Sequence, residues 1–174
     1  MENLNKKYIS PFVVGLGAGV LLIVPIIKGL ACCLLIPAAA FLSLLLEQKA
    51  SKDYSKLEIK KGVVFGLITG VTAAIFGTTF DFIITLITHT NDLVVAFPEL
   101  IETLNSFPID DALREEVISL LSNVVDSIKN NGFSPLYTLS VLFNNLFSNS
   151  IFGVLGGIIG VQILNSQNQK RKLF

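Results

Sequence analysis

A short glycine pattern occurs three times in this chain, each time inside a long apolar segment. The pattern Gly-x-x-x-Gly-Val begins at Gly15, at Gly66 and at Gly156. A glycine inside a helix costs about 1 kcal/mol relative to alanine, so three such placements need a compensating benefit. In a bilayer that benefit is close approach of helix backbones, because lipid supplies no hydrophobic force that drives helices together. The pattern predicts an all-α, polytopic membrane helix bundle.

The composition agrees with a membrane protein. Hydrophobic residues make up 52% of the 174 residues, and charged residues make up only 15%, whereas soluble domains average about 25% charged residues. A chain of this length forms one domain, so we expect a single membrane domain over residues 1–174. We expect the lipid bilayer as a partner and no nucleic acid.

Four apolar segments are candidate spans, and they cover residues 9–27, 30–46, 62–87 and 136–164. A spanning helix needs about 20 apolar residues, so the third and fourth segments are long enough. The first two are shorter and are separated only by Lys28 and Gly29, while Pro25 and Pro37 predict kinks. They form either a tight hairpin of two spans or a pair that barely crosses. We expect the hairpin, and therefore four transmembrane helices.

The basic residues predict the orientation of these spans. Ten of the thirteen lie before the first span, between the second and third, or after the fourth. They are Lys6, Lys7, Lys49, Lys52, Lys56, Lys60, Lys61, Lys170, Arg171 and Lys172. Cytoplasmic segments carry the excess of Lys and Arg. We therefore expect a multi-pass protein of the cell membrane with both termini in the cytoplasm.

The connection between the third and fourth spans, residues 92–132, is expected to be an external amphipathic helical segment. Pro98 is expected to open a short helix, and Asp110 or Asp111 to cap a longer one that stops at Asn131-Gly132. Its apolar residues recur at helical spacing. They are Leu113, Val117, Leu120, Leu121, Val124, Val125 and Ile128. Because its polar face is acidic rather than basic, we expect the stripe to pack on the end of the bundle or on a partner and not on anionic lipid.

Small residues follow one face of the third span at steps of three and four, and a similar face runs along the fourth. These faces, with the glycines of the first span, are the predicted helix-packing sites. The glycines at these sites are Gly15, Gly19, Gly62, Gly66, Gly70, Gly77, Gly153, Gly156, Gly157 and Gly160.

Asp81 lies in line with the small-residue stripe and is the one acid inside an apolar run. An intramembrane carboxylate costs roughly 2.5–3.5 kcal/mol on insertion scales, so it calls for a partner. The polar residues of the fourth span that could serve are Asn144, Asn145 and Asn149. Three interpretations stay open: a hydrogen bond from Asp81 to Asn144 or Asn145, a proton or cation site, or a carboxylate that reaches the interface.

Chemistry-bearing residues are otherwise sparse. The chain has one histidine, His89, which we expect to cap the third span, and two cysteines, Cys32 and Cys33. Neighbouring cysteines cannot join distant segments, and we interpret them as small apolar residues. A membrane enzyme would need clustered His, Asp, Glu or Cys on facing helices. No catalytic residue, cofactor or metal site is expected.

Several short motifs in this chain are similar to those of a known group of membrane proteins. Residues 31–37 read Ala-Cys-Cys-Leu-Leu-Ile-Pro, residues 61–66 read Lys-Gly-Val-Val-Phe-Gly, and an acidic connection and a basic tail follow. In this the chain resembles small four-span integral membrane proteins of bacteria, a family defined by a domain of unknown function. The resemblance implies a fold and a topology but no activity.

These observations favour a non-catalytic integral membrane protein. It would be a scaffold, an accessory subunit or a self-associating bundle, with a homo-oligomer or a membrane protein as its partner. The alternative is a small oligomeric transporter or channel that uses Asp81 and the Asn-rich face of the fourth span.

Overall fold

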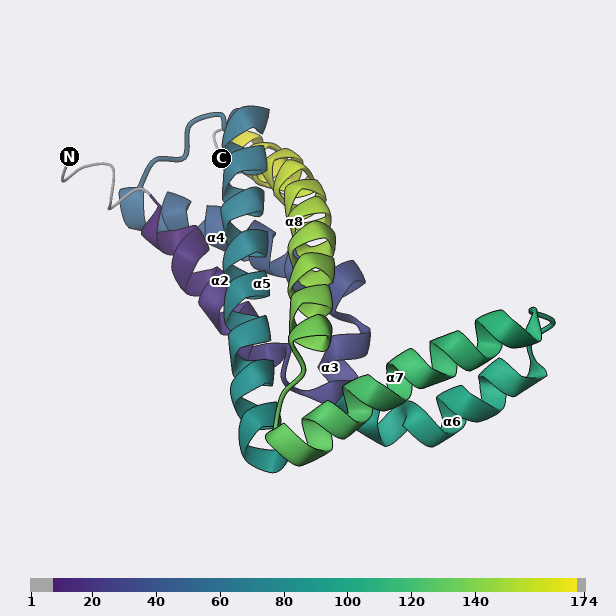
Figure 1. The fold of residues 1–174 in the computed structure, drawn as a ribbon. Coiled ribbons are helices and arrows are strands. Elements are labelled where there is room, and N and C mark those ends of the chain that lie inside the picture. The colour runs from purple at the N-terminus through teal and green to yellow at the C-terminus, as the bar shows by residue number, and fades with distance from the viewer. Residues whose placement is uncertain (1–7, 172–174) are drawn as a thin grey trace. The chain divides into compact units, whose positions relative to one another are not determined.

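Helices make up all the regular secondary structure of the described residues (Figure 1). The computed structural model describes residues 8–171, except for the side chains of residues 25, 26, 31, 32 and 171. The α-helices are α2 (Ile9–Leu21), α3 (Pro25–Gly29), α4 (Ile36–Ser51), α5 (Ile59–Thr88), α6 (Asp92–Ser106), α7 (Asp111–Asn131) and α8 (Pro135–Arg171). One π-helical turn, η1 (Ala31–Leu35), precedes α4. The predicted all-α class is confirmed.

Three helical stretches are long and apolar enough to cross a membrane, judged by length and composition alone. They are Cys33–Ser51, Ile59–Thr88 and Pro135–Lys170. They correspond to the second, third and fourth predicted segments, and the helices extend beyond the predicted ends because polar residues such as Glu47, Gln48 and Asn165 continue them.

The first predicted span, residues 9–27, is not one helix. Helix α2 has 13 residues, which at 1.5 Å per residue reach about 20 Å, whereas a bilayer core is about 30 Å thick. The chain leaves the helical conformation at Val24, whose ψ is 118°, and restarts with Pro25 as the first residue of α3. The ring of a proline disfavours the α conformation of the residue before it, so Pro25 separates the two helices.

Pro37 acts differently, because it lies within a continuous helical run. It is the second residue of α4, directly after the π-helical turn η1. A proline removes an N–H from the helix ladder, and a local π turn is one way for the chain to accommodate that loss. The predicted kink is therefore a change of helix type.

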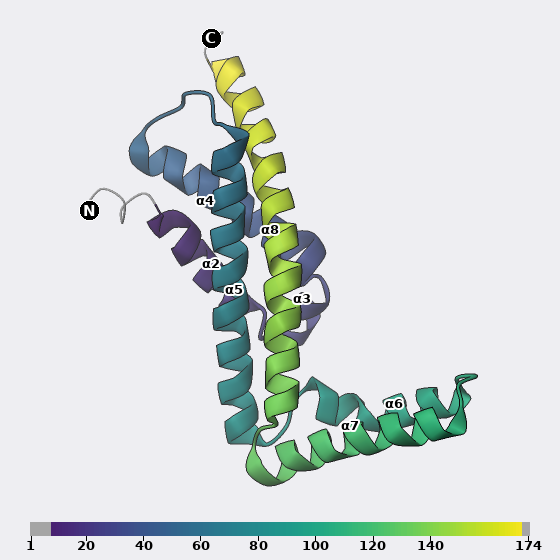
Figure 2. The same cartoon turned by 45° about the horizontal axis from the view of Figure 1, so that its top comes forward.

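The chain divides into two units, which we describe separately. Unit 1 comprises residues 1–78 and 142–174, and unit 2 comprises residues 79–141, so α5 and α8 contribute to both. In unit 1, α2 packs against α4, and the parts of α5 and α8 within unit 1 run side by side (Figure 2). In unit 2, α6 packs against α7.

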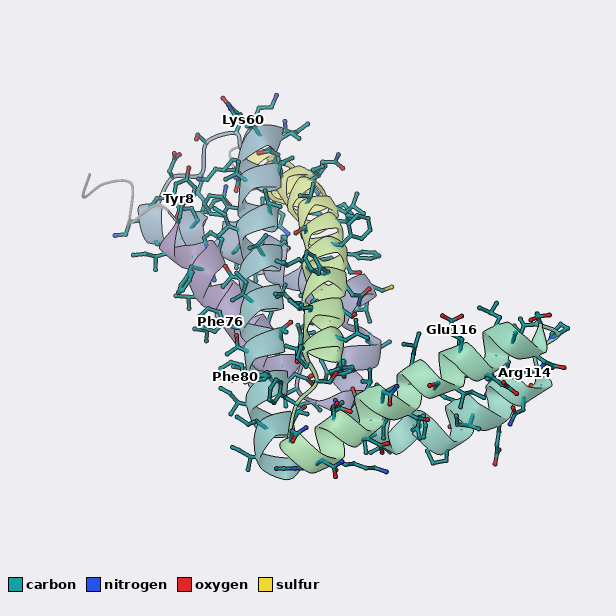
Figure 3. All side chains as sticks on the ribbon, viewed as in Figure 1. Tyr8, Lys60, Phe76, Phe80, Arg114 and Glu116 are labelled. Carbon is teal, nitrogen blue, oxygen red and sulfur yellow. The ribbon has the colours of Figure 1, made fainter. Side chains whose placement is uncertain are left out.

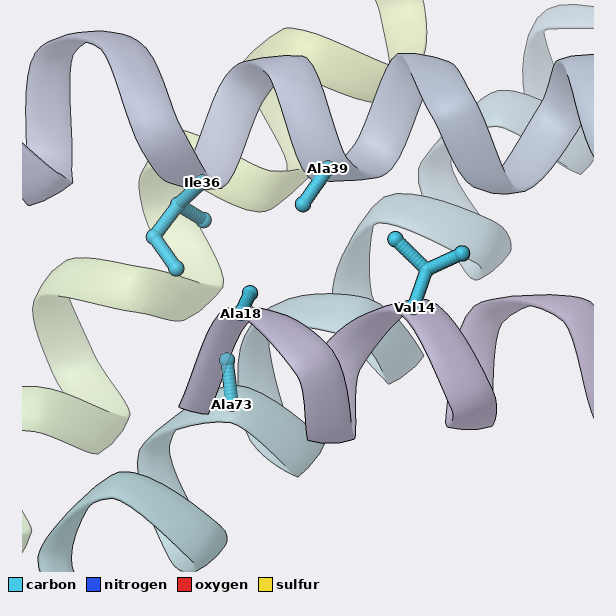
Figure 4. Packing of buried hydrophobic residues seen from close by; sticks show 5 residues of the cluster. All are labelled: Val14, Ala18, Ile36, Ala39 and Ala73. Atoms are coloured by element: carbon cyan, nitrogen blue, oxygen red, sulfur yellow. The ribbon is translucent and has the colours of Figure 1, made fainter. Parts of the chain in front are cut away.

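One of the buried apolar clusters of unit 1 is built mainly from small side chains. Figure 4 shows residues from α2, α4 and α5 meeting in it. They are Val14, Ala18, Ile36, Ala39 and Ala73. Since three of the five are alanines, the helices that carry them lie close together.

Unit 2 is a helical hairpin with marked helix ends. Asn91 caps α6 by accepting a hydrogen bond from the N–H of Val94 at 3.0 Å, and Asp110 caps α7 by accepting from the N–H of Ala112 at 2.9 Å. Gly132 ends α7 in the left-handed region, with φ of 78°. The predicted cap at Asp110 and stop at Gly132 are confirmed.

The predicted opening of a helix at Pro98 is wrong. Pro98 lies inside α6, and the helix starts six residues earlier, at Asp92. The side chain of Asn91 supplies the cap, and asparagine is among the strongest N-cap residues. Without its own N–H, Pro98 can sit within the helix at the cost of one ladder hydrogen bond.

Candidate functional site

The closest backbone contact in unit 1 joins α5 to α8. A Cβ atom added to Gly66 would overlap the carbonyl of Gly153, and one added to Gly70 would overlap the carbonyl of Asn149. A Cβ added to Gly62 would lie 2.6 Å from the carbonyl oxygen of Gly157. The residue numbers of the partners on α8 decrease as those of the glycines on α5 increase, so the two segments are antiparallel. The structure thus brings Gly62, Gly66 and Gly70 together with Gly153 and Gly157.

A different face of α5 receives α2. A Cβ on Gly15 would lie 2.7 Å from the carbonyl oxygen of Thr69, and one on Gly19 would lie 3.0 Å from the backbone nitrogen of Gly77. Gly77 in turn faces Leu22, at 2.9 Å from its Cδ1. Helices α2 and α5 therefore run parallel with backbone close to backbone.

The remaining glycines of α8 receive α4. A Cβ on Gly156 would lie 2.7 Å from the carbonyl oxygen of Pro37, and one on Gly160 would lie 3.2 Å from the Cα of Phe41. All ten glycines named from the sequence thus face another segment of the same chain. By contrast, Gly17 and Gly29 have no atom within 4 Å of such a Cβ.

The predicted polar cluster is distributed over both units. In unit 1, Asn145 donates a hydrogen bond from Nδ2 to Oγ1 of Thr78 at 3.0 Å. Asn149 is buried, with 4% of its surface exposed, and Asn144 is exposed. Asp81 is partly buried on the part of α5 that belongs to unit 2. The hydrogen bond from Asp81 to Asn144 or Asn145 stays a prediction.

The structure shows a second polar region that sequence reasoning missed, where α2 and α5 begin and α4 ends. Glu47 is 9% exposed, and its carboxylate lies 3.7 Å from Nζ of Lys61 and accepts a hydrogen bond from Ser10 at 3.5 Å. Lys61 also lies over the ring of Phe65, 5.3 Å from its centroid. A glutamate one helical turn before the Lys-rich connection was the signal that could have indicated this partly buried ion pair.

An asparagine ties the connection between α4 and α5 to the end of α8. The side chain of Asn165 accepts a hydrogen bond from the N–H of Leu57 at 2.7 Å and donates one to the carbonyl of Leu57 at 2.9 Å. These two bonds satisfy both backbone groups of one residue in an irregular segment. A single asparagine within a helix gives no sequence signal for such a contact.

A pocket of about 360 Å³ opens beside this region. Tyr8, the connection between α4 and α5, and the first turns of α5 line it, and Tyr8 and Lys60 are labelled in Figure 3. Lys56 and Lys61 contribute further positive charge, and Tyr8 and Phe65 pack as a tilted ring pair with centroids 6.0 Å apart. The pocket therefore combines cations with an apolar wall.

His89 and Cys33 fit structural roles. His89 follows α5 in the left-handed region with φ of 53°, and its N–H bonds to the carbonyl of Thr85 at 2.8 Å, so it caps the helix as predicted. Its Nδ1 lies 3.0 Å from the carbonyl oxygen of Lys129. Cys33 is exposed, and the side chain of Cys32 lies outside the described residues. Among the side chains that the structure describes, no three His, Cys, Asp or Glu residues gather in a way that could hold a metal ion.

Comparison with known proteins gives no relative: no protein-family model matches the chain, and no curated protein or solved structure is significantly similar to it. The resemblance to four-span bacterial proteins stays a prediction, and the function has to be argued from the side chains.

Proposed function

We propose that the chain is a non-catalytic integral membrane protein, a scaffold or accessory subunit whose helices are held together by backbone contact at glycines. The observation that carries this proposal is where the large and the small side chains lie in unit 1. Buried positions of its helices are mostly glycine, alanine, serine and threonine, whereas many of the large apolar side chains are exposed. That is the reverse of a water-soluble bundle.

Helix α8 gives the clearest example of this distribution. Every fourth residue along it is a large apolar side chain with 42–71% of its surface exposed. These residues are Phe143, Phe147, Ile151, Leu155, Ile159 and Ile163. Full burial of such a side chain from water contributes about 1.5–3 kcal/mol, and these residues forgo the part that belongs to their exposed surface, whereas in lipid no such cost arises. The stripe therefore supports contact with lipid.

Membrane insertion can be tested by washing isolated membranes with alkaline carbonate, which releases peripheral proteins. We expect the protein to stay in the pellet. Release into the supernatant would overturn the proposal.

The charge distribution supports the orientation in which both termini are cytoplasmic and residues 92–132 are outside. The exposed lysines between α4 and α5 would then lie on the cytoplasmic side. Reporter fusions at the C-terminus and after Lys129 distinguish the two sides. A cytoplasmic signal from the fusion after Lys129 would contradict this orientation.

The glycine contacts bear on how a scaffold would meet its partner. Because all ten predicted glycines already face another segment of this chain, a homo-oligomer or a membrane-protein partner would have to use other surfaces. Co-purification from native membranes distinguishes a stable partner from a homo-oligomer.

One observation keeps a transport role as a second candidate. Within residues 8–171, the buried Oγ1 of Thr69 and Nδ2 of Asn149 have no hydrogen-bond partner, and polar groups inside a membrane-spanning bundle are costly unless they serve a function such as an ion path. In reconstituted vesicles, Asp81→Asn and Asn149→Leu should each abolish a cation or proton flux if the transport proposal holds. Unchanged flux in both variants would remove it.

A further inference from the structure

The pocket between the start of α2 and the start of α5 has an uneven distribution of charge. Three lysines and two carboxylates line it, so its wall carries one net positive charge. Lys61 is engaged with Glu47 and the Phe65 ring. Lys56 and Lys60 are exposed, and neither side chain has a hydrogen-bond or ion-pair partner among residues 8–171. The pocket thus holds two ammonium groups that an anion could neutralise.

The two carboxylates do not compete equally for these lysines. Asp53 accepts a hydrogen bond from the N–H of Ser55 at 2.9 Å. The backbone and side chain of Ser55 both donate to it and lower the pKa of Asp53, and the charge of Lys61 adds to the effect. Glu58 lies directly before α5, and its carbonyl accepts from the N–H groups of Lys61 and Gly62. The Asp53 carboxylate is thus held by its own turn, and among residues 8–171 no ion pair joins Asp53 or Glu58 to Lys56 or Lys60.

The pocket also has an apolar wall. Leu57, Val64 and the rings of Tyr8 and Phe65 form this wall. Leu57 and Phe65 also belong to a buried cluster that Tyr8 packs against. A ligand that fits must therefore be charged at one end and apolar at the other.

We propose that this pocket binds an anionic phospholipid, with Lys56 and Lys60 on the phosphodiester and the Tyr8–Phe65 wall against the start of the acyl chains. The proposal rests on the membrane insertion proposed above. A phosphodiester carries one negative charge, which matches the net charge of the wall. The first turn of a 30-residue helix lies at the same place, and its partial positive charge favours an anion there.

The test uses the purified full-length protein in an uncharged detergent and three probes. Dioctanoyl phosphatidylglycerol presents the headgroup with acyl chains, glycerophosphoglycerol presents the headgroup alone, and inorganic phosphate presents the anion alone. We expect saturable binding of the lipid, measured by calorimetry, weaker binding of glycerophosphoglycerol, and the weakest response to phosphate. Equal binding of inorganic phosphate and lipid would overturn the lipid assignment in favour of a free-phosphate site.

The variant Lys56→Gln/Lys60→Gln removes the two available charges. We expect it to bind the lipid about 30-fold more weakly, which corresponds to roughly 1 kcal/mol for each lysine. The matched control, Lys49→Gln/Lys170→Gln, removes two exposed lysines that do not line the pocket, and it should bind like the wild type. Equal loss of affinity in both variants would show a diffuse charge effect and overturn the pocket.

Both variants change exposed side chains, so folding should survive, and a thermal scan without lipid checks it. Membrane insertion is measured separately by the carbonate wash. If the wild-type protein stays in the membrane pellet but shows no saturable lipid binding, the pocket proposal is refuted. The proposed function as a membrane protein would remain intact.

Discussion

Each of the two units of this molecule is stabilised internally by a different kind of contact. In unit 1 the helices approach until backbone meets backbone, as at Gly66 and Gly153, and α2, α3 and α4 have no side-chain hydrogen bond at their N-caps. In unit 2, by contrast, side chains form hydrogen bonds at the helix ends: Asn91 caps α6 and Asp110 caps α7. The same chain thus contains a contact mode typical of lipid and one typical of water.

The turn of the unit 2 hairpin shows the second mode most clearly. Arg114, labelled in Figure 3, donates hydrogen bonds to the carbonyl groups of Leu104 at 3.2 Å and of Phe107 and Ile109 at 3.1 Å. It also forms an ion pair with Asp111. One guanidinium therefore satisfies carbonyl groups at the end of α6 and in the loop, as its fixed fork of donors permits.

This difference predicts which substitutions will destabilise each unit. If unit 1 depends on the absence of side chains, adding atoms at its glycines should be the most damaging change in the molecule. If unit 2 depends on particular side-chain hydrogen bonds, removing donors should damage it, while its exposed apolar positions tolerate change.

The largest effect is expected for Gly66→Leu/Gly70→Leu. Each new side chain would overlap the backbone of α8, and because both partners are backbone, neither can rotate away. We expect a loss of more than about 4 kcal/mol in the free energy of unfolding, enough to abolish a monodisperse folded protein. Thermal unfolding and size-exclusion chromatography in detergent measure it.

Gly17→Leu is the matched control, because the same substitution is made in an open position of α2. We expect little change in stability, and a small gain from the better helix propensity of leucine. Near-normal thermal stability of the Gly66→Leu/Gly70→Leu protein would count against backbone contact as the basis of unit 1.

The next largest effect is expected in unit 2, for Arg114→Met. The variant keeps the apolar stem but loses the donors, and hydrogen bonds from a charged group contribute about 1.5–3 kcal/mol. Hydrogen exchange in the full-length protein should show faster opening at the end of α6 and the start of α7. Arg114→Lys retains the charge without the fork, so protection restored by lysine would show that charge rather than geometry holds the turn.

The contrast between the units also explains what could be predicted from the sequence. Features that depend only on residues close in sequence could be predicted. They are the cap at Asp110, the stop at Gly132 and the two long helices. The glycine steps could indicate which faces pack, since a stripe of small residues has few other uses in a helix. The glycine spacing could not predict which pairs of helices pack together, because one face of small residues can pack against any other.

Two kinds of feature could not be predicted from the sequence, for physical reasons. The break at Val24 depends on whether Pro25 kinks a helix or ends it, and both outcomes are compatible with an apolar run. The contacts of Asn165 with Leu57 and of Glu47 with Lys61 join residues that are distant or sit in an irregular segment. Single polar residues at helix ends do not indicate which partner they will find.

A smaller effect is expected for Asn165→Ala, which tests whether unit 1 also needs side-chain hydrogen bonds. The substitution leaves the N–H and the carbonyl of Leu57 without their partner, and we expect a loss of about 1–2 kcal/mol. Asn165→Asp keeps an acceptor for the N–H but loses the donor, so it should fall between alanine and wild type. Gln162→Ala changes an exposed residue of α8 and should leave the unfolding temperature unchanged.

The smallest effect is expected for Asp53→Asn, in a turn of unit 1 that, like the helix caps of unit 2, uses a side-chain hydrogen bond. Asp53 accepts hydrogen bonds from Ser55 as a cap residue does, and these lower its pKa in the folded protein. A carboxyl group with a lowered folded pKa stabilises the fold above its unfolded value of about 4, and that contribution is lost as the pH falls through the folded pKa. The stability difference between wild type and Asp53→Asn should therefore be constant from about pH 6 to 5 and shrink below about pH 4. Thermal unfolding of both proteins across this range measures it, and a difference independent of pH would mean that the ionised form of Asp53 adds nothing to the turn. Since Asp53 is exposed in this connection, even the expected result would leave backbone contact as the dominant source of stability in unit 1.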